Sequence, residues 1–219
     1  MIAYVNAHAV NLAHDLPWFR EFLDSCDVVY CDGFGVSLAA WLLGQKVPPR
    51  HTPPDWIGDL CKRAEAEGLS MFMLGASPGV ADKAADRLRE HAPGLKIAGI
   101  HHGYFNKVRD GSENLAVVRA INLARPNILL VGFGMPLQEQ WILQNREELR
   151  VGAILTVGAL FDHLAGEVKR APRWMTDRGL EWLGRLVIEP RRLWRRYLLG
   201  NPRFLMRVMA HRIGLRRHS

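Results

Sequence analysis

Residues 127–139 read NILLVGFGMPLQE, and this stretch decides the fold class. Its first part, 127–131, is a continuous apolar run of strand length, which indicates a strand buried on both faces of a sheet. A glycine-rich turn ends the run, and a helical pattern follows over 136–149. A buried strand that passes through such a turn into a helix is the building unit of α/β proteins with a parallel sheet.

The same alternation extends over the first 165 residues of the 219-residue chain. Besides 127–131, strands are expected at 2–5, 27–31, 69–74, 95–100 and 153–157. Helices are expected at 16–23, 35–43, 55–67, from Ser77-Pro78 to about residue 91, at 108–124 and at 136–149. We therefore predict an α/β fold with a Rossmann-like, mostly parallel sheet and helices on both faces.

The pattern changes after about residue 166. Tryptophan, leucine and arginine dominate there and the strand signals end. We predict an α/β domain over 1–168 and a C-terminal, helical and basic appendage over 169–219.

The net charge of +7 is concentrated in one segment. Residues 190–219 contain nine arginines and no acid, which leaves 20 of the 29 basic residues beside all 22 acidic ones elsewhere. This asymmetry indicates an anionic surface as partner. Aromatic and aliphatic side chains at helical spacing separate the arginines, which favours a basic amphipathic helix on a membrane surface. The alternative is a helix packed on the core with a solvated charged face.

Cysteine usage and hydropathy indicate a cytoplasmic protein. Cys26, Cys31 and Cys61 are an odd number in apolar surroundings, as expected of reduced, buried thiols. No signal-peptide pattern opens the chain, and no stretch reaches the roughly 18 apolar residues that span a bilayer. The chain is expected to be soluble or peripheral.

In a doubly wound sheet, ligands bind beyond the carboxyl ends of the strands. The chemistry is therefore expected in the loops that follow the predicted strands. These loops are 6–8, 32–35, 75–77, 101–105, 132–139 and 158–162.

Gly132 and Gly134 follow a strand and precede a helix, where backbone N–H groups can meet a phosphate. The third glycine of the dinucleotide fingerprint is missing, because Leu137 stands there. A tight turn without a ligand is the alternative. Gln138 and Glu139, in the first helical turn, can reach a sugar or ribose hydroxyl, or Glu139 complements the helix dipole.

Asp32 lies where a strand opens into Gly33-Phe34-Gly35. A carboxylate at this position can act as a general base toward a hydroxyl, or it can cap the following helix. Asp162, in the loop after 153–157, has the same two interpretations.

Residues 101–105 read HHGYF. Adjacent histidines of a strand point to opposite faces and do not share one ion, so no metal site is expected. Tyr104 or Phe105 can stack on a base, or can pack in the core.

Several motifs occur in a fixed order along the chain: NAH (6–8), NLA (11–13), DGFGV (32–36), HHGYF (101–105), GFGMPLQEQWI (132–142), GALFD (158–162), LAGEVKRAP (164–172), GLEWL (179–183) and EPRR (189–192). Together they resemble the WecG/TagA/CpsF family of glycosyltransferases over nearly the full chain.

This resemblance implies an inverting, metal-independent hexosyltransferase without a cofactor. It would move an N-acetylmannosamine-type or related sugar from a UDP-sugar to a polyprenyl-diphosphate-linked acceptor, in exopolysaccharide or teichoic acid-like biosynthesis. It implies a peripheral place on the inner face of the cytoplasmic membrane, and family members often self-associate.

The resemblance also implies site residues. Asp32 is the aspartate of the motif that supplies the catalytic base. Residues 1–168 would be the catalytic domain. The appendage, residues 169–219, would help to bind the membrane and would complete the active site with arginines near the donor diphosphate. The residues expected to bind donor or other substrate are Asn6, His8, Gly33, Gly35, Gly75, Tyr104, Gly132, Gly134, Gln138, Glu139, Gly158, Phe161, Asp162, Arg191, Arg192 and Arg195.

Two segments depart from the family pattern. Tyr4 or Val5 stands where a threonine is usual, and residues 50–56, RHTPPDW, replace R-x-x-G-x-D-L. Both departures concern the expected sugar or acceptor pocket, so they bear on which sugar is used rather than on the reaction.

Two other classes of protein fit less well. A nicotinamide-dependent oxidoreductase needs the full glycine fingerprint, which is absent. A nucleic-acid binder could use the arginine tail, but nothing in the first 165 residues resembles a nucleic-acid module, so no nucleic acid is expected as partner.

Overall fold

The computed structural model describes residues 1–46, 49–169, 171–176 and 178–217. Arg170, part of one motif above, lies outside the described residues. The chain forms two compact units. Unit 1 comprises residues 1–3, 22–28 and 53–168, and unit 2 comprises residues 4–21, 29–52 and 169–219.

The described residues form one six-stranded sheet in the order β2-β1-β6-β5-β3-β4. Pairs β1–β6, β6–β5, β5–β3 and β3–β4 are parallel. The predicted α/β class and parallel sheet are therefore confirmed. The strands are β1 (Ile2–Val5), β2 (Val28–Cys31), β3 (Ser70–Gly75), β4 (Lys96–His101), β5 (Ile128–Gly132) and β6 (Ala153–Thr156).

The central strands of unit 1 bury both faces, which explains their continuous apolar sequence. In β3, Met71 and Met73 point into one hydrophobic core, whereas Phe72 and Leu74 point into a second core. Strand β5 alternates in the same way along 128–131. Each large apolar side chain buried in this manner stabilises the fold by roughly 1.5–3 kcal/mol.

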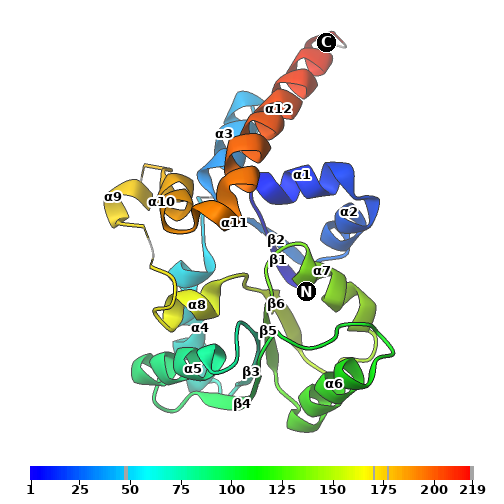
Figure 1. The fold of residues 1–219 in the computed structure, drawn as a ribbon, viewed down its shortest axis with the longest axis vertical. Helices are drawn as coiled ribbons and strands as arrows, with labels where there is room; N and C mark the ends of the chain where they lie inside the picture. Colours follow the sequence, from blue (N-terminus) through cyan, green and yellow to red (C-terminus); the bar gives the residue numbers. More distant parts are fainter. Residues whose placement is uncertain (47–48, 170, 177, 218–219) are drawn as a thin grey trace. The chain divides into compact units, whose positions relative to one another are not determined.

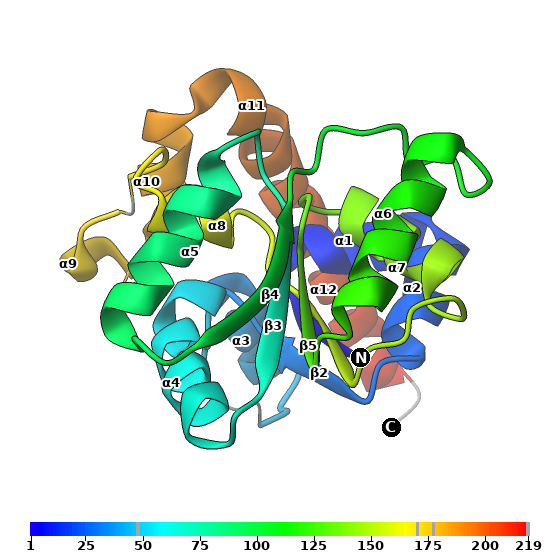
Figure 2. The same cartoon turned by 90° about the horizontal axis from the view of Figure 1, so that it is seen from below.

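Five helices cover the two faces of this part of the sheet. The helices α4 (Pro53–Ala66), α5 (Val80–His91) and α8 (Leu160–Leu164) pack on the first core, and α6 (Ser112–Ala124) and α7 (Leu137–Asn145) pack on the second. Figure 1 and Figure 2 show the two groups on opposite sides of β3 and β5.

Three predicted helix boundaries in unit 1 are wrong. Helix α5 starts at Val80 rather than at Ser77-Pro78, because Gly79 adopts the left-handed conformation (φ 81°) at its N-cap. Helix α6 starts at 112 rather than 108, because the N-cap Gly111 is extended (ψ 143°). Helix α7 ends at Asn145 rather than 149, where the Asn145 side chain donates to the carbonyl of Trp141 (2.8 Å).

Unit 2 contains a helix where the sequence predicted a loop. Helix α1 (Ala7–Asp15) begins directly after β1, and Asn6 is its N-cap. The side-chain oxygen of Asn6 accepts from the backbone N–H groups of His8 and Ala9, both at 3.1 Å. This is the usual way in which asparagine satisfies the free donors of a helix start.

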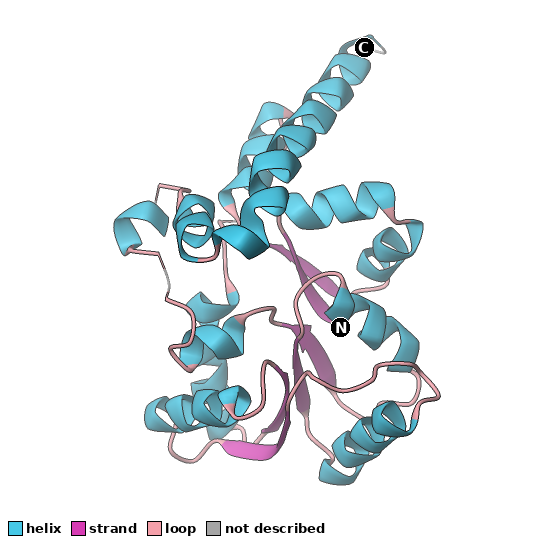
Figure 3. Ribbon diagram, viewed as in Figure 1, coloured by secondary structure: helices cyan, strands magenta, loops and turns pink. Residues whose placement is uncertain are grey.

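From α8 onward, all described elements are helices (Figure 3). The predicted boundary at 168/169 is also a boundary between the units, but unit 2 additionally includes 4–21 and 29–52. The reason is a separate small core in which Phe204 and Val208 pack against Ala39. The remaining helices are α2 (Pro17–Asp24), α3 (Phe34–Leu42), α9 (Arg173–Thr176), α10 (Glu181–Ile188), α11 (Pro190–Trp194), a π-helical turn η1 (Arg195–Leu199) and α12 (Gly200–Arg217).

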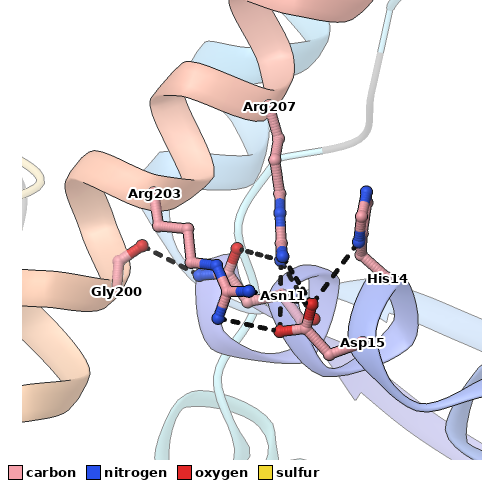
Figure 4. A network of polar contacts seen from close by, with 6 residues as sticks. All are labelled: Asn11, His14, Asp15, Gly200, Arg203 and Arg207. Atoms are coloured by element: carbon pink, nitrogen blue, oxygen red, sulfur yellow. Dashed lines mark hydrogen bonds and ion pairs between the residues drawn. The ribbon is translucent and has the colours of Figure 1, made fainter.

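A polar network joins α12 to α1 (Figure 4). Asn11 donates to the carbonyl of Gly200 at 2.8 Å and accepts from Arg207 at 2.9 Å. Arg207 and Arg203 both pair with the carboxylate of Asp15, at 2.5 and 3.1 Å. The hydrogen bond from Arg207 lowers the pKa of Asp15. The attachment of α12 is therefore strongest while Asp15 is ionised.

We expect Asp15→Asn to loosen α12, because both arginines lose their charged partner. At pH 7 the amides of α12 should exchange hydrogen faster than in the wild type. The difference should disappear as the pH falls through the lowered pKa of Asp15, since the native carboxylate is then neutral too. Hydrogen exchange with mass spectrometry measures this. Asp86→Asn, which breaks an ion pair on α5, is the control, and equal exchange of α12 in Asp15→Asn and the wild type would contradict the role of the network.

Candidate active site

A cavity of about 490 Å³ lies within unit 2. It is formed around the end of β2 by the start of α1, the start of α3, α10, η1 and α12. The residues that line it are Asn6, Ala7, His8, Asp32, Gly33, Phe34, Gly35, Leu38, Arg50, Arg178, Gly179, Leu180, Glu181, Trp182, Arg185, Arg196, Tyr197, Leu198, Asn201, Pro202, Phe204 and Leu205.

Strand pairing places Asp32 at this cavity. The Asp32 backbone N–H donates to the carbonyl of Val5 at 2.8 Å, which extends the β1–β2 pairing by one residue. The chain then turns at Gly33, whose φ of 120° favours glycine. Gly33, and not Asp32, occupies the N-cap of α3, so the capping alternative for Asp32 is wrong. Its carboxylate instead faces the cavity.

Asn6 holds this carboxylate. Its amide nitrogen lies 3.4 Å from Oδ2 of Asp32, while its oxygen caps α1. One side chain therefore fixes both the start of α1 and the orientation of the carboxylate.

Burial controls the protonation states in the cavity. It raises the pKa of Asp32 to about 6; the neighbouring Glu181 adds to the rise, and Asn6 and Arg196 oppose it. Burial also lowers the pKa of His8 to about 4, together with the positive charge of Arg196. At neutral pH the cavity thus contains an ionised carboxylate of raised basicity beside a neutral imidazole.

Three charged residues of this cavity were not predicted from the sequence: Arg178, Glu181 and Arg185. A fourth, Arg50, begins the segment 50–56 that was expected at the sugar or acceptor pocket. Arg50 and Glu181 form an ion pair at 2.5 Å although 131 residues separate them. No local pattern reveals such a pair. Glu181 and Arg185 lie four residues apart, so their helical spacing could have placed them on one face of α10.

Of the arginines near the start of the appendage, Arg196 lines the cavity, whereas Arg191, Arg192 and Arg195 do not. These three are exposed. Arg192 pairs with Glu189 at 2.9 Å, and Arg195 lies over the ring of Trp194.

In unit 1, the loops after β3, β4 and β5 pack backbone against backbone. A Cβ atom on Gly75 (φ 151°) would lie 2.3 Å from the carbonyl oxygen of Gly132, and one on Gly103 would lie 2.9 Å from the ring of Phe133. Glycine is required here because the loops approach one another. Gly134 differs: its φ is 80°, and a Cβ atom on it would meet no other atom within 4 Å, so space remains above it.

Gln138 joins the loops after β5 and β6. Its side-chain oxygen accepts from the N–H groups of Gly134 (3.2 Å) and Gly158 (3.1 Å). Its amide donates to Glu139 at 2.7 Å, and both side chains are buried. These two side chains were expected to reach a substrate hydroxyl, whereas the structure shows them fixing the loops. Glu139 lies in the first turn of α7, the position at which an acidic side chain complements the helix dipole.

The other predicted residues of unit 1 lie around these loops. Tyr104 is 71% exposed, so a core role is excluded for it, whereas Phe105 packs on the second core beside Phe133. Phe161 is buried beneath Gly132, and Asp162 lies in α8. The carboxyl ends of β3, β5 and β6 thus bring together Gly75, Gly132, Gly134 and Gly158 at the edge of the sheet where ligand binding was expected.

Within the described ranges, no cluster of three or more His, Cys, Asp or Glu side chains is arranged to hold a metal ion.

Comparison with known proteins agrees with the geometry. The sequence model of the Glycosyl transferase WecG/TagA/CpsF family matches residues 1–218. The chain belongs to this family.

Two relatives in the WecG/TagA/CpsF family are named N-acetylglucosaminyldiphosphoundecaprenol N-acetyl-beta-D-mannosaminyltransferase. The protein of Bacillus spizizenii is 30% identical over 195 residues, which cover 89% of this chain and 73% of the relative. That of Staphylococcus aureus is 29% identical over 207 residues, which cover 94% and 78%. The resemblance that the motifs indicated is thus confirmed, and the chain is a glycosyltransferase by family.

In the part of the chain that the structure describes, no helix is both long and apolar enough to cross a bilayer.

Ionisation of the buried Asp32 carboxyl group should lower the free energy of unfolding. Its pKa rises from an ordinary 3.8 to about 6, so between these values the folded protein binds more protons than the unfolded one. Stability therefore falls as the pH rises through this window, by about 2–3 kcal/mol in total. Asp32→Asn removes this dependence, and its stability relative to the wild type should grow by that amount from pH 4 to pH 7.5.

Urea unfolding at the two pH values measures the difference. Gly58→Ala, in the open middle of α4, is a control that changes no titratable group. A difference between Asp32→Asn and the wild type that is the same at both pH values would contradict the raised pKa.

Proposed function

We propose that this protein transfers an N-acetylmannosamine-type or related sugar from a UDP-sugar to a polyprenyl-diphosphate-linked sugar, with inversion at the anomeric carbon and without a metal ion or other cofactor. The reaction serves cell-surface polysaccharide biosynthesis of the exopolysaccharide or teichoic acid-like kind. The names of the relatives support the acceptor class and the sugar.

The placement of Asp32 carries the proposal. Inversion is a single displacement, in which a base takes the proton of the acceptor hydroxyl as that oxygen attacks the anomeric carbon. Asp32 lies in a cavity of unit 2, oriented by Asn6, with a pKa of about 6. It is ionised at neutral pH and more basic than an ordinary carboxylate, as this role requires.

The remaining predicted residues are assigned by unit. The acceptor hydroxyl lies at Asp32, in a part of the cavity that is lined by Asn6, His8, Gly33 and Gly35. The donor is bound at the loops of unit 1, where the side chain of Tyr104 is exposed and the space above Gly134 is open. Gln138 and Glu139 keep these loops in place. The other residues expected at the donor site are Gly75, Gly132, Gly158, Phe161 and Asp162.

Asp32→Asn should reduce transfer by roughly 10²–10⁴-fold, because the amide cannot accept the proton. In the wild type, kcat/KM should fall about tenfold per pH unit below pH 6. The assay uses UDP-N-acetylmannosamine, with UDP-N-acetylglucosamine and UDP-glucose for comparison, and an N-acetylglucosaminyl-diphosphate acceptor. UDP should bind the variant as it binds the wild type, as calorimetry would show.

Asp27→Asn is the matched control, since its carboxylate is 81% exposed five residues before Asp32. It should transfer at the wild-type rate. Near-wild-type transfer by Asp32→Asn would reject Asp32 as the base.

We further propose that the protein is peripheral on the inner face of the cytoplasmic membrane. On helix α12, Phe204 and Val208 pack in the small core of unit 2, while Leu205, Met206 and Met209 remain exposed. One face of this helix packs on the core, and the other leaves apolar side chains in contact with solvent. Exposed apolar side chains in a segment that also exposes arginines 191, 192 and 195 suit an anionic lipid surface.

The double variant Arg191→Gln/Arg195→Gln should bind less well to vesicles that contain anionic phospholipid. Each charge near the lipid contributes about 1 kcal/mol, so partitioning should fall about 30-fold for the two. High salt should remove the difference, and zwitterionic vesicles should not show it. Cosedimentation measures partitioning, with Arg87→Gln/Arg89→Gln on α5 as the control. Equal binding of both double variants would argue against this membrane surface.

A further inference from the structure

The cavity of unit 2 has walls of two kinds. Asp32, Arg185 and Arg196 contribute charged groups. Arg50, Arg178 and Glu181 add further charges, and Arg50 and Glu181 pair with each other. Apolar side chains form another large part of the lining, chiefly Phe34, Leu38, Leu198, Pro202 and Leu205. A ligand that fills this cavity must therefore carry both charged and apolar groups.

The charged wall suits an anion. The Nε–H groups of Arg185 and Arg196 are buried, and neither has a hydrogen-bond acceptor among the described residues. A buried donor without an acceptor costs free energy, and more so on a charged group. The nearby carboxylate of Glu181 already pairs with Arg50. Two guanidinium groups with free donors match the oxygens of a diphosphate.

The apolar wall continues to the surface. Phe34, Leu198 and Leu205 line the cavity, and yet their side chains are 51%, 53% and 41% exposed. They come from the start of α3, from η1 and from α12, so three separate segments place apolar side chains at one opening. Exposed apolar side chains gathered in this way mark a binding surface.

The π-helical turn connects the two walls. Arg196, Tyr197 and Leu198 are consecutive in η1, and all three line the cavity. In this turn the chain presents a cation, an aromatic ring and an aliphatic side chain to the same space. Such π-turns occur often at functional sites.

We propose that this cavity binds the diphosphate and the first isoprene units of the lipid-linked acceptor. Arg185 and Arg196 hold the diphosphate, and Phe34, Leu198 and Leu205 hold the prenyl chain. The inference rests on the proposed function, because it assigns the cavity to the acceptor of that reaction. A UDP-sugar is polar throughout and leaves the apolar wall uncovered, so the cavity discriminates the acceptor from the donor.

Calorimetry on the full chain, without membranes, tests the assignment with three probes: inorganic diphosphate, farnesol and farnesyl diphosphate. Farnesyl diphosphate should bind at least tenfold more tightly than either fragment, because only it contacts both walls. An N-acetylglucosaminyl-diphospho-farnesyl acceptor should bind at least as tightly as farnesyl diphosphate, and UDP should not displace either one.

Neighbouring residues supply matched variants. Leu198 lines the cavity and Leu199 does not, though both are more than half exposed. In a second pair of exposed neighbours, Leu205 lines the cavity and Met206 does not. Leu198→Ala and Leu205→Ala should weaken farnesyl diphosphate binding about five- to tenfold and leave inorganic diphosphate unchanged. Leu199→Ala and Met206→Ala should change neither. Arg196→Gln should weaken both diphosphates but not farnesol.

The variants separate this subsite from general lipid contact, since all four apolar substitutions should lower vesicle binding to a similar extent. Equal effects of Leu198→Ala and Leu199→Ala on farnesyl diphosphate would overturn the assignment, as would displacement by UDP or failure of the sugar-linked acceptor to bind. If the expected binding pattern holds while no sugar is transferred, the proposed function fails and the prenyl diphosphate site stands. If transfer proceeds and Leu198→Ala leaves the KM of the farnesyl acceptor unchanged, the site fails and the function stands.

Discussion

Helix α1 is the element on which unit 2 depends, and the side chain of Asn6 sets its start. The Asn6 oxygen caps α1, and the Asn6 nitrogen orients Asp32. At the other end of the helix, Asn11 and Asp15 hold α12 through Gly200, Arg203 and Arg207. Helix α12 in turn supplies Leu205 to the cavity. The carboxylate and the apolar wall are therefore positioned by one short helix.

Asp32 illustrates a conflict between stability and chemistry. Burial disfavours the ionised carboxylate and raises its pKa to about 6, and the single long hydrogen bond from Asn6 offsets this only in part. A second strong donor would stabilise the charge and would also make the carboxylate a weaker base. The local environment thus leaves the charge incompletely compensated, as is common for groups that must accept a proton.

Local sequence patterns predicted the parts of the fold that depend on neighbours along the chain. The alternation of Met71, Phe72, Met73 and Leu74 between two cores follows from strand geometry, so the parallel sheet could be predicted. Helix α1 was missed although Asn6 is a good N-cap, because residues after a strand were assumed to form a loop. The ion pair of Arg50 with Glu181 could not be predicted, since the two residues are 131 positions apart in the sequence and meet only through the folded path of the chain.

The glycine-rich loops were predicted correctly in place, but their physical reason was only partly foreseen. Gly75 and Gly132 lack side chains because the two loops touch, and Gln138 occupies the backbone donors of Gly134 and Gly158. A sequence motif shows that the backbone approaches something closely; it does not show whether that is a ligand or another loop.

The C-terminal tail poses the same problem. Its apolar residues were predicted to share one helix face, yet Phe204 and Val208 are buried while Leu205 and Met209 are exposed. A helix that is apolar on two faces needs a partner for each. The protein core supplies one, and the lipid-linked acceptor that we propose would give a physical reason to keep the other exposed.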